Sequence, residues 1–319
     1  MADRARVAVL ISGRGTNMAA LLYAAKQDDC PYEIVLAAAN DPEARGLALA
    51  SAEGIPTFAQ SHKGMDRSEF DAILDREIRA AGADYIVLAG YMRILSEAFV
   101  NNWQGRMLNV HPSLLPKYPG LDTHERAIAA GDTVSGCTVH LVTPVLDDGP
   151  ILGQTEVAIL PGDTPEKLAT RIRLAEHQLY PKVLAELVSR ERDPDWIVAK
   201  VGELAMALPE VAAKTSHGAP GWRVATTKSG KFFAYVSIRH HGEDAISLLV
   251  KTSGPDEQAA LIEAEPDIYY KPAYYGPSGW IAIRLDRPDV EWDHIADWLR
   301  KSWSFVAPKK LQGMAEFLV

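Results

Sequence analysis

Residues 6–17 read Arg-Val-Ala-Val-Leu-Ile-Ser-Gly-Arg-Gly-Thr-Asn, and this stretch decides the fold of the first part of the chain. Its aliphatic and β-branched residues 6–11 predict a buried strand. A glycine-rich turn follows at residues 12–17, and a helical apolar pattern begins at Met18. A strand, a tight turn and a helix in this order form the first half of a βαβ unit, which predicts a mainly parallel sheet.

The same alternation continues to about residue 190. We expect further strands at residues 33–38, 55–59 and 84–89, and helices at 18–26, 43–53 and 67–81. Two β-rich runs at 137–143 and 151–159 precede a long helix at 164–189, which opens with Asp163-Thr164-Pro165. The pattern therefore predicts an α/β domain with an open, mostly parallel twisted sheet and helices on both faces, of the Rossmann-like kind.

The chain changes character after residue 190. Residues 190–195 are charged and contain Pro194, so we place a linker at residues 191–207, which includes a short helical stretch. Strand-like runs at 232–239, 245–251 and 280–285, with turns at Ser229-Gly230 and His241-Gly242, predict an antiparallel sheet. Helices expected at 256–263 and 292–302 complete an α+β domain. The expected domains are thus residues 1–190 and 208–319.

Composition excludes several classes of protein. The net charge is −9, and neither the part before residue 208 nor the part after it has the basic excess of a protein that grips phosphate backbones. Cys30 and Cys137 are the only cysteines, too few for a disulfide scaffold or a cysteine metal site. The first strand begins too early for a leader peptide, and no apolar run is long enough to span a membrane. We expect a cytoplasmic protein without a membrane partner.

Residues 109–120 read Asn-Val-His-Pro-Ser-Leu-Leu-Pro-Lys-Tyr-Pro-Gly and place chemistry where a strand gives way to a loop. Asn109 and His111, two residues apart on an extended segment, share one face. Asp147 lies in the turn at residues 146–150, and a carboxylate beside His111 favours the charged imidazole, whereas desolvation opposes it. Together, an amide, an imidazole and a carboxylate can polarise an acyl oxygen and move a proton. Taken singly, His111 and Asp147 also fit purely structural roles.

The turn at residues 12–17 is a candidate anion site. It opens the first helix, where free backbone N–H groups and the helix dipole favour a phosphate. The spacing fits neither the dinucleotide fingerprint nor the phosphate loop of nucleoside triphosphatases. A glycine-rich turn with no ligand fits this segment equally well.

Four segments, at residues 10–17, 88–96, 109–121 and 147–150, together resemble the phosphoribosylglycinamide formyltransferase family in order and spacing. The resemblance covers residues 1–190. It implies that Asn109, His111 and Asp147 are catalytic. It also implies a site for the phosphate and ribose of glycinamide ribonucleotide, formed by backbone groups of Gly15, Thr16 and Asn17 together with Arg173 and Glu176. A second implied site binds the folate and is lined by Met92, Arg93, Ile94, Leu95 and the turn from Val142 to Asp147, with Arg67 at its entrance.

The resemblance further implies direct transfer of the formyl group of 10-formyltetrahydrofolate to the amine of glycinamide ribonucleotide, a step of purine biosynthesis. Neither a metal nor a covalent intermediate is required. We expect His140 to pack or to orient its neighbours rather than to react. The oligomeric state is left open between a monomer and a homodimer.

Three other functions stay open at this point. Methionyl-tRNA formyltransferase shares the Asn-x-His and Asp arrangement, although Lys117-Tyr118-Pro119-Gly120 and the lack of basic excess disfavour it. Formyltetrahydrofolate hydrolase normally carries a regulatory domain before its folate domain, and few residues precede the first strand here. A non-catalytic folate or nucleotide sensor has no need of a charged relay beside its pocket.

The C-terminal part, roughly residues 208–311, resembles the MmcQ/YjbR family of small α+β domains, in segments 208–211, 231–234, 272–276, 280–283 and 302–306. Some members are suggested to bind DNA. The nearly neutral charge of this part disfavours such a partner, because phosphate contacts supply most non-specific affinity. We expect Trp222 and Trp280 to pack in a core rather than to stack on bases, and no nucleic acid partner.

Overall fold

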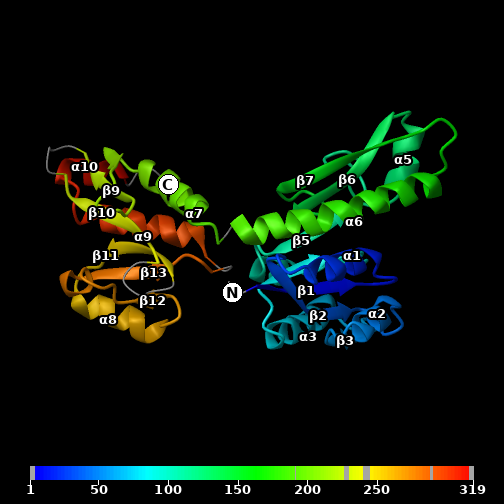
Figure 1. Ribbon diagram of the computed structural model, residues 1–319, viewed down its shortest axis with the longest axis horizontal. Helices are drawn as coiled ribbons and strands as arrows, with labels where there is room; N and C mark the ends of the chain where they lie inside the picture. Colours follow the sequence, from blue (N-terminus) through cyan, green and yellow to red (C-terminus); the bar gives the residue numbers. More distant parts are fainter. Residues whose placement is uncertain (1–3, 191, 226–229, 240–244, 288–289, 316–319) are drawn as a thin grey trace. The chain divides into compact units, whose positions relative to one another are not determined.

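The computed structural model in Figure 1 describes residues 4–190, 192–225, 230–239, 245–287 and 290–315. The chain divides into two compact units, Met1–Ser189 and Arg190–Val319, called unit 1 and unit 2 below. In the described part of the chain, no helix combines the length and the apolar character needed to cross a membrane.

Unit 1 is built on a seven-stranded sheet in the order β3-β2-β1-β4-β5-β6-β7. The strands from β3 to β5 run parallel, whereas β6 pairs antiparallel with both β5 and β7. The mostly parallel sheet expected from the sequence is therefore confirmed. The strands are β1 (Ala5–Ile11), β2 (Tyr32–Ala39), β3 (Thr57–Ala59), β4 (Tyr85–Leu88), β5 (Met107–His111), β6 (Val134–Leu141) and β7 (Ile151–Ala158).

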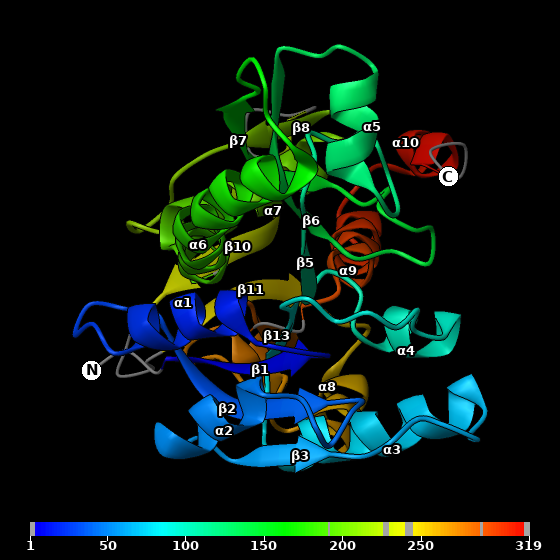
Figure 2. The ribbon, with the colours of Figure 1, turned by 90° about the vertical axis from the view of Figure 1, so that its right-hand side faces the viewer.

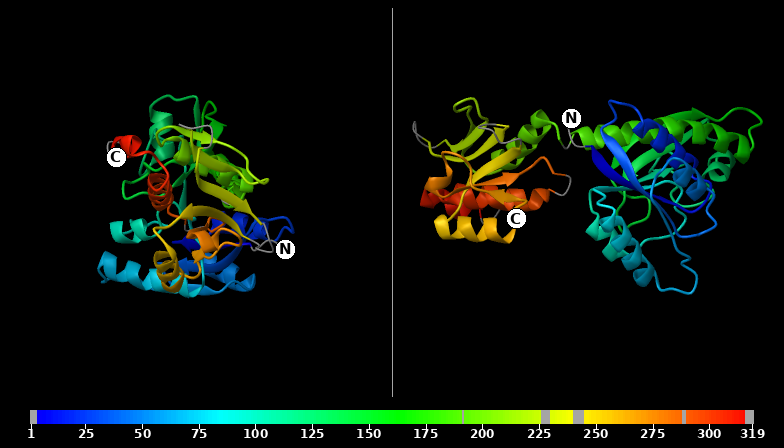
Figure 3. Two further views of the ribbon diagram at one scale, coloured as in Figure 1. Left: turned by 90° about the vertical axis from the view of Figure 1, so that its left-hand side faces the viewer. Right: turned by 60° about the horizontal axis from the view of Figure 1, so that its bottom comes forward.

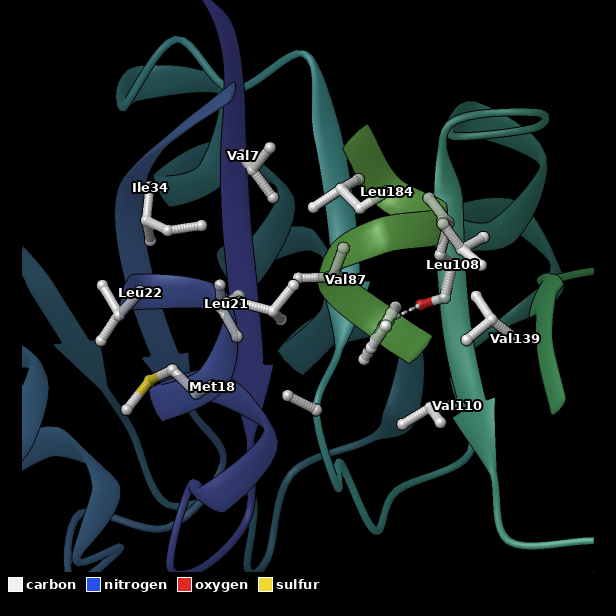
Figure 4. Packing of buried hydrophobic residues seen from close by; sticks show 14 of the residues in the cluster. Val7, Met18, Leu21, Leu22, Ile34, Val87, Leu108, Val110, Val139 and Leu184 are labelled. Atoms are coloured by element: carbon white, nitrogen blue, oxygen red, sulfur yellow. Dashed lines mark hydrogen bonds between the residues drawn. The ribbon is translucent and has the colours of Figure 1, made fainter. Parts of the chain in front are cut away.

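Helices cover both faces of this sheet (Figure 2). They are α1 (Thr16–Ala25), α2 (Gly46–Ala52), α3 (Arg67–Ala80), α4 (Glu97–Asn102), α5 (Thr123–Ala129) and α6 (Pro165–Arg190). The side chains of β1 alternate between the faces: Val7 and Val9 pack with α1 and α6, whereas Ala8 packs with α3 and α4. Figure 4 shows the first of these cores, where Met18 and Leu21 of α1 and Leu184 of α6 lie against the strands. Both faces are buried at the central strands β1 and β4, which explains why these two strands are almost continuously apolar.

Side-chain caps mark the start of two helices of unit 1. Asp66 caps α3 by accepting a hydrogen bond from the Ser68 N–H, and Ser96 caps α4 through the Phe99 N–H. The helix expected at residues 43–53 begins only at Gly46, and the short helices α4 and α5 were not expected. Six or seven residues give too little periodicity to reveal a helix from the pattern alone.

Unit 2 contains, in its described residues, a six-stranded antiparallel sheet in the order β12-β13-β11-β10-β9-β8. Helix α9 (Trp292–Ser304), in orange-red in Figure 3, packs on one face of this sheet. The other elements are β8 (Val211–Ala213), β9 (Gly221–Val224), β10 (Phe232–Ile238), β11 (Ile246–Lys251), α8 (Pro255–Ala264), β12 (Tyr269–Tyr270), a 3₁₀ turn η1 (Gly276–Ser278), β13 (Trp280–Arg284) and α10 (Lys309–Ala315).

The segment that we expected to link two domains forms helix α7 (Pro194–Met206). Asp193 caps it through the Asp195 N–H, and Ile197, Val201 and Ala205 are fully buried in the core of unit 2. This helix is thus part of unit 2, because its apolar stripe has a sheet to cover. The turns expected at Ser229-Gly230 and His241-Gly242 lie outside the described residues.

Candidate active site

Three loops of unit 1 follow the carboxyl ends of neighbouring parallel strands: residues 12–15 after β1, 89–96 after β4 and 112–122 after β5. The helices that follow β1 and β4 cover opposite faces of the sheet, so the strand order reverses between these two strands. Open α/β sheets bind ligands in the crevice outside such a point. Of the residues expected from the sequence, Gly15 and residues 92–95 belong to these loops, and Asn109 and His111 lie on β5. The others lie on α1, α3, α6 and the loop between β6 and β7.

Asn109 and His140 face each other across the antiparallel pair of β5 and β6. The His140 Nδ1 donates to the carbonyl oxygen of Leu141 at 2.9 Å, which leaves Nε2 as an acceptor for the Asn109 amide at 3.3 Å. Burial lowers the pKa of His140, although the Leu141 carbonyl and Asp147 oppose this effect. A neutral His140 therefore orients the Asn109 amide, in line with the orienting role expected for it.

His111 and Asp147 form a buried pair. The distance from His111 Nδ1 to Asp147 Oδ2 is 3.3 Å, and the two side chains are 7% and 6% exposed. The other ring nitrogen, Nε2, donates to the carbonyl oxygen of Tyr118 at 2.9 Å. Both ring nitrogens thus face acceptors, an arrangement that a doubly protonated ring satisfies completely. The second oxygen of Asp147, Oδ1, lies 3.7 Å from His140 Nε2.

Asp147 reaches this site because the loop at residues 142–150 folds tightly onto its own strand. A Cβ on Gly149 would lie 1.7 Å from the Leu141 carbonyl oxygen, so only glycine fits there. Asp147 itself has a φ of 53°, and its Oδ2 accepts the Gly120 N–H at 2.9 Å. The structure therefore brings Asp147 to His111 directly, and it leaves Asp147 Oδ1 3.7 Å from the His140 nitrogen that accepts from Asn109.

The glycine-rich turn packs against the start of α2. Gly15 has a φ of 68°, and a Cβ there would lie 3.0 Å from the Gly46 Cα. The Gly46 N–H also donates to the Gly13 carbonyl at 3.0 Å. Both glycines are needed for this close approach. The turn leads into α1, whose first N–H groups have no partner within the helix. Thr16 is exposed at this end of the helix.

Asn17 and Glu176 connect this turn to the long helix α6. The Asn17 Nδ2 donates to Glu176 Oε2 at 2.9 Å, in a buried contact. Burial raises the pKa of Glu176 above its usual range, and the Asn17 amide and nearby Arg173 oppose the rise. Arg173, one turn before His177, is exposed. The residues expected to bind phosphate and ribose therefore lie at one end of the sheet.

The loop after β4 carries the residues expected to line a folate pocket. Met92 and Ile94 are 76% and 59% exposed, although both are large apolar side chains, whereas Leu95 is buried. Arg93 lies over the ring of Phe70 and faces Asp71, with Nε and Oδ1 3.9 Å apart. The Arg93 side chain is only 13% exposed. An exposed apolar loop beside a largely buried guanidinium suits a flat ligand that ends in a carboxylate.

Arg67 and Val142 stand at the margin of this loop. Arg67 is the exposed first residue of α3, and no described contact joins it to Asn109, His111 or Asp147. Val142 packs with the core on the α3 side of the sheet, and its N–H donates to the Met107 carbonyl.

Residues 5–184 match the family model described as formyl transferase. The chain belongs to the formyl transferase family. The Escherichia coli phosphoribosylglycinamide formyltransferase is 42% identical to this formyl transferase chain over 180 residues, which are 56% of the chain and 85% of the relative. A trifunctional purine biosynthetic protein of Drosophila melanogaster is 48% identical over 189 residues, so the chain spans 14% of that protein's length.

Solved structures agree with the formyl transferase fold. The phosphoribosylglycinamide formyltransferase of Brucella melitensis is 48% identical, with a TM-score of 0.56, and the match covers 58% of this chain and 95% of that one. For glycinamide ribonucleotide transformylase 1 of Geobacillus kaustophilus the identity is 39%, the TM-score 0.56 and the coverage 58% and 99%. The formyl transferase family match at residues 5–184 lies within unit 1.

Sequence reasoning missed several groups that surround the site of the formyl transferase unit. The carbonyl of Tyr118 accepts from His111, and the N–H of Gly120 donates to Asp147, but backbone groups leave no signal in a residue pattern. His124, on α5, has a buried Nε2 without a hydrogen-bond partner in the described structure. Burial lowers its pKa, with Arg173 and His111 near enough to contribute. It follows Thr123 at a helix start that the sequence did not reveal.

Residues 206–305 match a second family model, YjbR, which confirms the resemblance of the C-terminal part. Trp222 and Trp280 are 3% and 5% exposed, and they belong to two clusters on opposite faces of the unit 2 sheet. Trp280 packs against Tyr235 and Tyr275. Both tryptophans therefore contribute to packing, as expected.

Proposed function

We propose that unit 1 transfers the formyl group of 10-formyltetrahydrofolate to the amine of glycinamide ribonucleotide, in purine biosynthesis. The observation that carries this proposal is the buried contact between His111 and Asp147, with Asn109 on the same strand as His111. The names of the relatives and the match over residues 5–184 support the same substrates. No metal takes part in the proposed reaction. We place the reaction in the cytoplasm.

In the proposed reaction the amine nitrogen attacks the formyl carbon, and a C–N bond forms. Negative charge gathers on the formyl oxygen, where the Asn109 amide and the His111 ring N–H donate hydrogen bonds. The bond between the carbon and the folate nitrogen then breaks, and the proton lost by the amine reaches that nitrogen with the help of Asp147. His111 must release the Tyr118 carbonyl before its Nε2 can reach a substrate oxygen.

The two substrates fit opposite sides of this centre. The turn at residues 12–17, with Arg173 and Glu176, supplies N–H groups and one cation for the ribonucleotide phosphate and a carboxylate for its ribose. Met92, Ile94, Leu95 and Val142 supply an apolar lining for the folate. Arg93 and Arg67 supply cations for its acidic end.

An acceptor assay with the full chain tests the proposal. The protein is mixed with formyl-folate and one of three acceptors: glycinamide ribonucleotide, charged initiator tRNA or water alone. Transfer to the ribonucleotide alone is expected. Formylation of tRNA points to a methionyl-tRNA formyltransferase, release of formate points to a hydrolase, and binding without turnover points to a sensor.

Asn109→Ala tests the assigned chemistry in the same assay. Loss of one oxyanion donor typically costs about 2.7–4 kcal/mol, which lowers kcat by about 10²- to 10³-fold. The matched control is Asn101→Ala, because Asn101 is exposed on α4 and has no assigned role. Near-normal turnover of the Asn109 variant refutes the assignment.

A further inference from the structure

Ser12 joins the loop after β1 to the loop after β4 by two hydrogen bonds. Its N–H donates to the Gly90 carbonyl at 3.1 Å, and its Oγ accepts the Met92 N–H at 2.7 Å. One residue of the first loop thus holds two backbone groups of the second. The Met92 side chain is 76% exposed, so this backbone contact fixes the loop where side-chain packing does not.

The direction of the Ser12 hydroxyl is itself fixed. A serine hydroxyl has one proton, and Ser12 gives it to Asn40 Oδ1 at 2.6 Å, which turns a lone pair towards the Met92 N–H. Asn40 is 5% exposed, and the His62 Nδ1 donates to the backbone carbonyl oxygen of Asn40 at 2.9 Å. In the link between the loops, the Met92 N–H therefore donates to the Ser12 hydroxyl, and the buried Asn40 side chain holds that hydroxyl in place.

The first loop is held by close backbone contacts beside Ser12. The Gly46 N–H donates to the Gly13 carbonyl at 3.0 Å, and a Cβ on Gly15 would lie 3.0 Å from the Gly46 Cα. A ligand that shifts this packed turn therefore shifts the Ser12 backbone and hydroxyl with it. Because the Met92 N–H donates to that hydroxyl, the position of the second loop depends on that of the first.

We propose that Ser12 is a positioning residue that couples the two substrate sites, so that a phosphate held by the turn at residues 12–17 favours the folate-binding form of residues 92–95, and the reverse. This inference rests on the proposed function, because that function assigns one substrate to each loop. Coupling of this kind is reciprocal by thermodynamic necessity.

Calorimetry with the full chain measures the coupling. Glycinamide ribonucleotide is titrated into the protein alone and into the protein saturated with tetrahydrofolate, which has no formyl group to transfer. The ratio of the two dissociation constants is the coupling factor, and it exceeds one in the natural protein.

In Ser12→Ala the Met92 N–H loses its acceptor. The coupling factor is expected to fall by about 2- to 12-fold, the range that one uncharged hydrogen bond contributes. Ser12→Thr keeps a hydroxyl and restores coupling. Asn40→Ala frees the Ser12 hydroxyl to turn away and lowers coupling as well. The matched control, Ser135→Ala, removes a buried serine of β6 and leaves coupling unchanged.

Two results overturn the inference alone: a natural protein that binds both ligands with a coupling factor of one, or a Ser12→Ala variant with undiminished coupling. A natural protein that binds neither ligand overturns the proposed function instead, and the inference falls with it. If Ser12 has a purely structural role, Ser12→Ala weakens the binding of both ligands and leaves the ratio of the two dissociation constants unchanged. That result also overturns the inference.

Discussion

Replacement of Asp147 by asparagine removes one negative charge that faces two imidazoles and keeps the shape of the side chain. The carboxylate lies 3.3 Å from His111 Nδ1 and 3.7 Å from His140 Nε2. The amide oxygen of an asparagine can still accept the Gly120 N–H, so the loop keeps its anchor. We therefore expect Asp147→Asn to fold normally and to lose catalysis.

The distances set the size of the loss. At 3.3 Å and an effective dielectric constant of 20, the attraction between the carboxylate and a charged His111 is about 5 kcal/mol. Both side chains are less than a tenth exposed, so solvent screens little of this attraction. If this interaction stabilises the transition state, kcat falls by about 10²- to 10⁴-fold.

The assay compares kcat/KM for formyl transfer to glycinamide ribonucleotide in the natural protein and the variant. Asp148→Asn is the matched control, because this exposed neighbour makes no hydrogen bond or ion pair with the described residues. It should change the rate by no more than about twofold. An Asp147→Asn variant that keeps its kcat/KM within about tenfold of the natural value, or a control that loses as much, would refute the reasoning.

Two further predictions concern the stability of unit 1. Tyr180 is fully buried, and its hydroxyl donates to the carbonyls of Leu108 at 2.9 Å and Leu88 at 3.3 Å, so Tyr180→Phe should lower the free energy of unfolding by about 1–3 kcal/mol. The urea dependence of amide exchange in β4 and β5 measures it, and an unchanged dependence contradicts the prediction. Burial raises the pKa of Glu176, so the folded state holds its proton more tightly than the unfolded chain, and unfolding free energy is lost as pH rises from about 4.5 towards the raised value. Glu176→Gln should remove this loss; urea unfolding at several pH values checks it, and parallel pH curves for the two proteins contradict it.

Much of unit 1 could be predicted because its signals are local. The strand at residues 6–11 and the glycine-rich turn after it were expected in place, since strand period and the positive φ of Gly15 are properties of neighbouring residues. The two-residue spacing of Asn109 and His111 likewise fixed their common face on β5. Short elements could not be predicted in this way, because a helix of seven residues such as α5 shows too little periodicity.

The linker shows a different limit. Residues 194–206 were recognised as helical in part, but their apolar stripe gave no indication of which core it would cover. Only the packing of Ile197 and Val201 among the strands of unit 2 decides that. An apolar stripe on a helix predicts that the helix packs against something, but which element it packs against is decided by the tertiary structure.

By itself, the sequence determined which groups are present: an amide and an imidazole on one strand face, a carboxylate in a downstream turn, and free N–H groups at a helix start. Tertiary structure alone decided how they are connected. The antiparallel register sets His140 opposite Asn109, the fold of residues 142–150 brings Asp147 to His111, and a loop carbonyl engages the remaining ring nitrogen. The physical reason is that backbone torsions and side-chain period are set between neighbours, whereas strand register and loop return depend on partners far away in the chain.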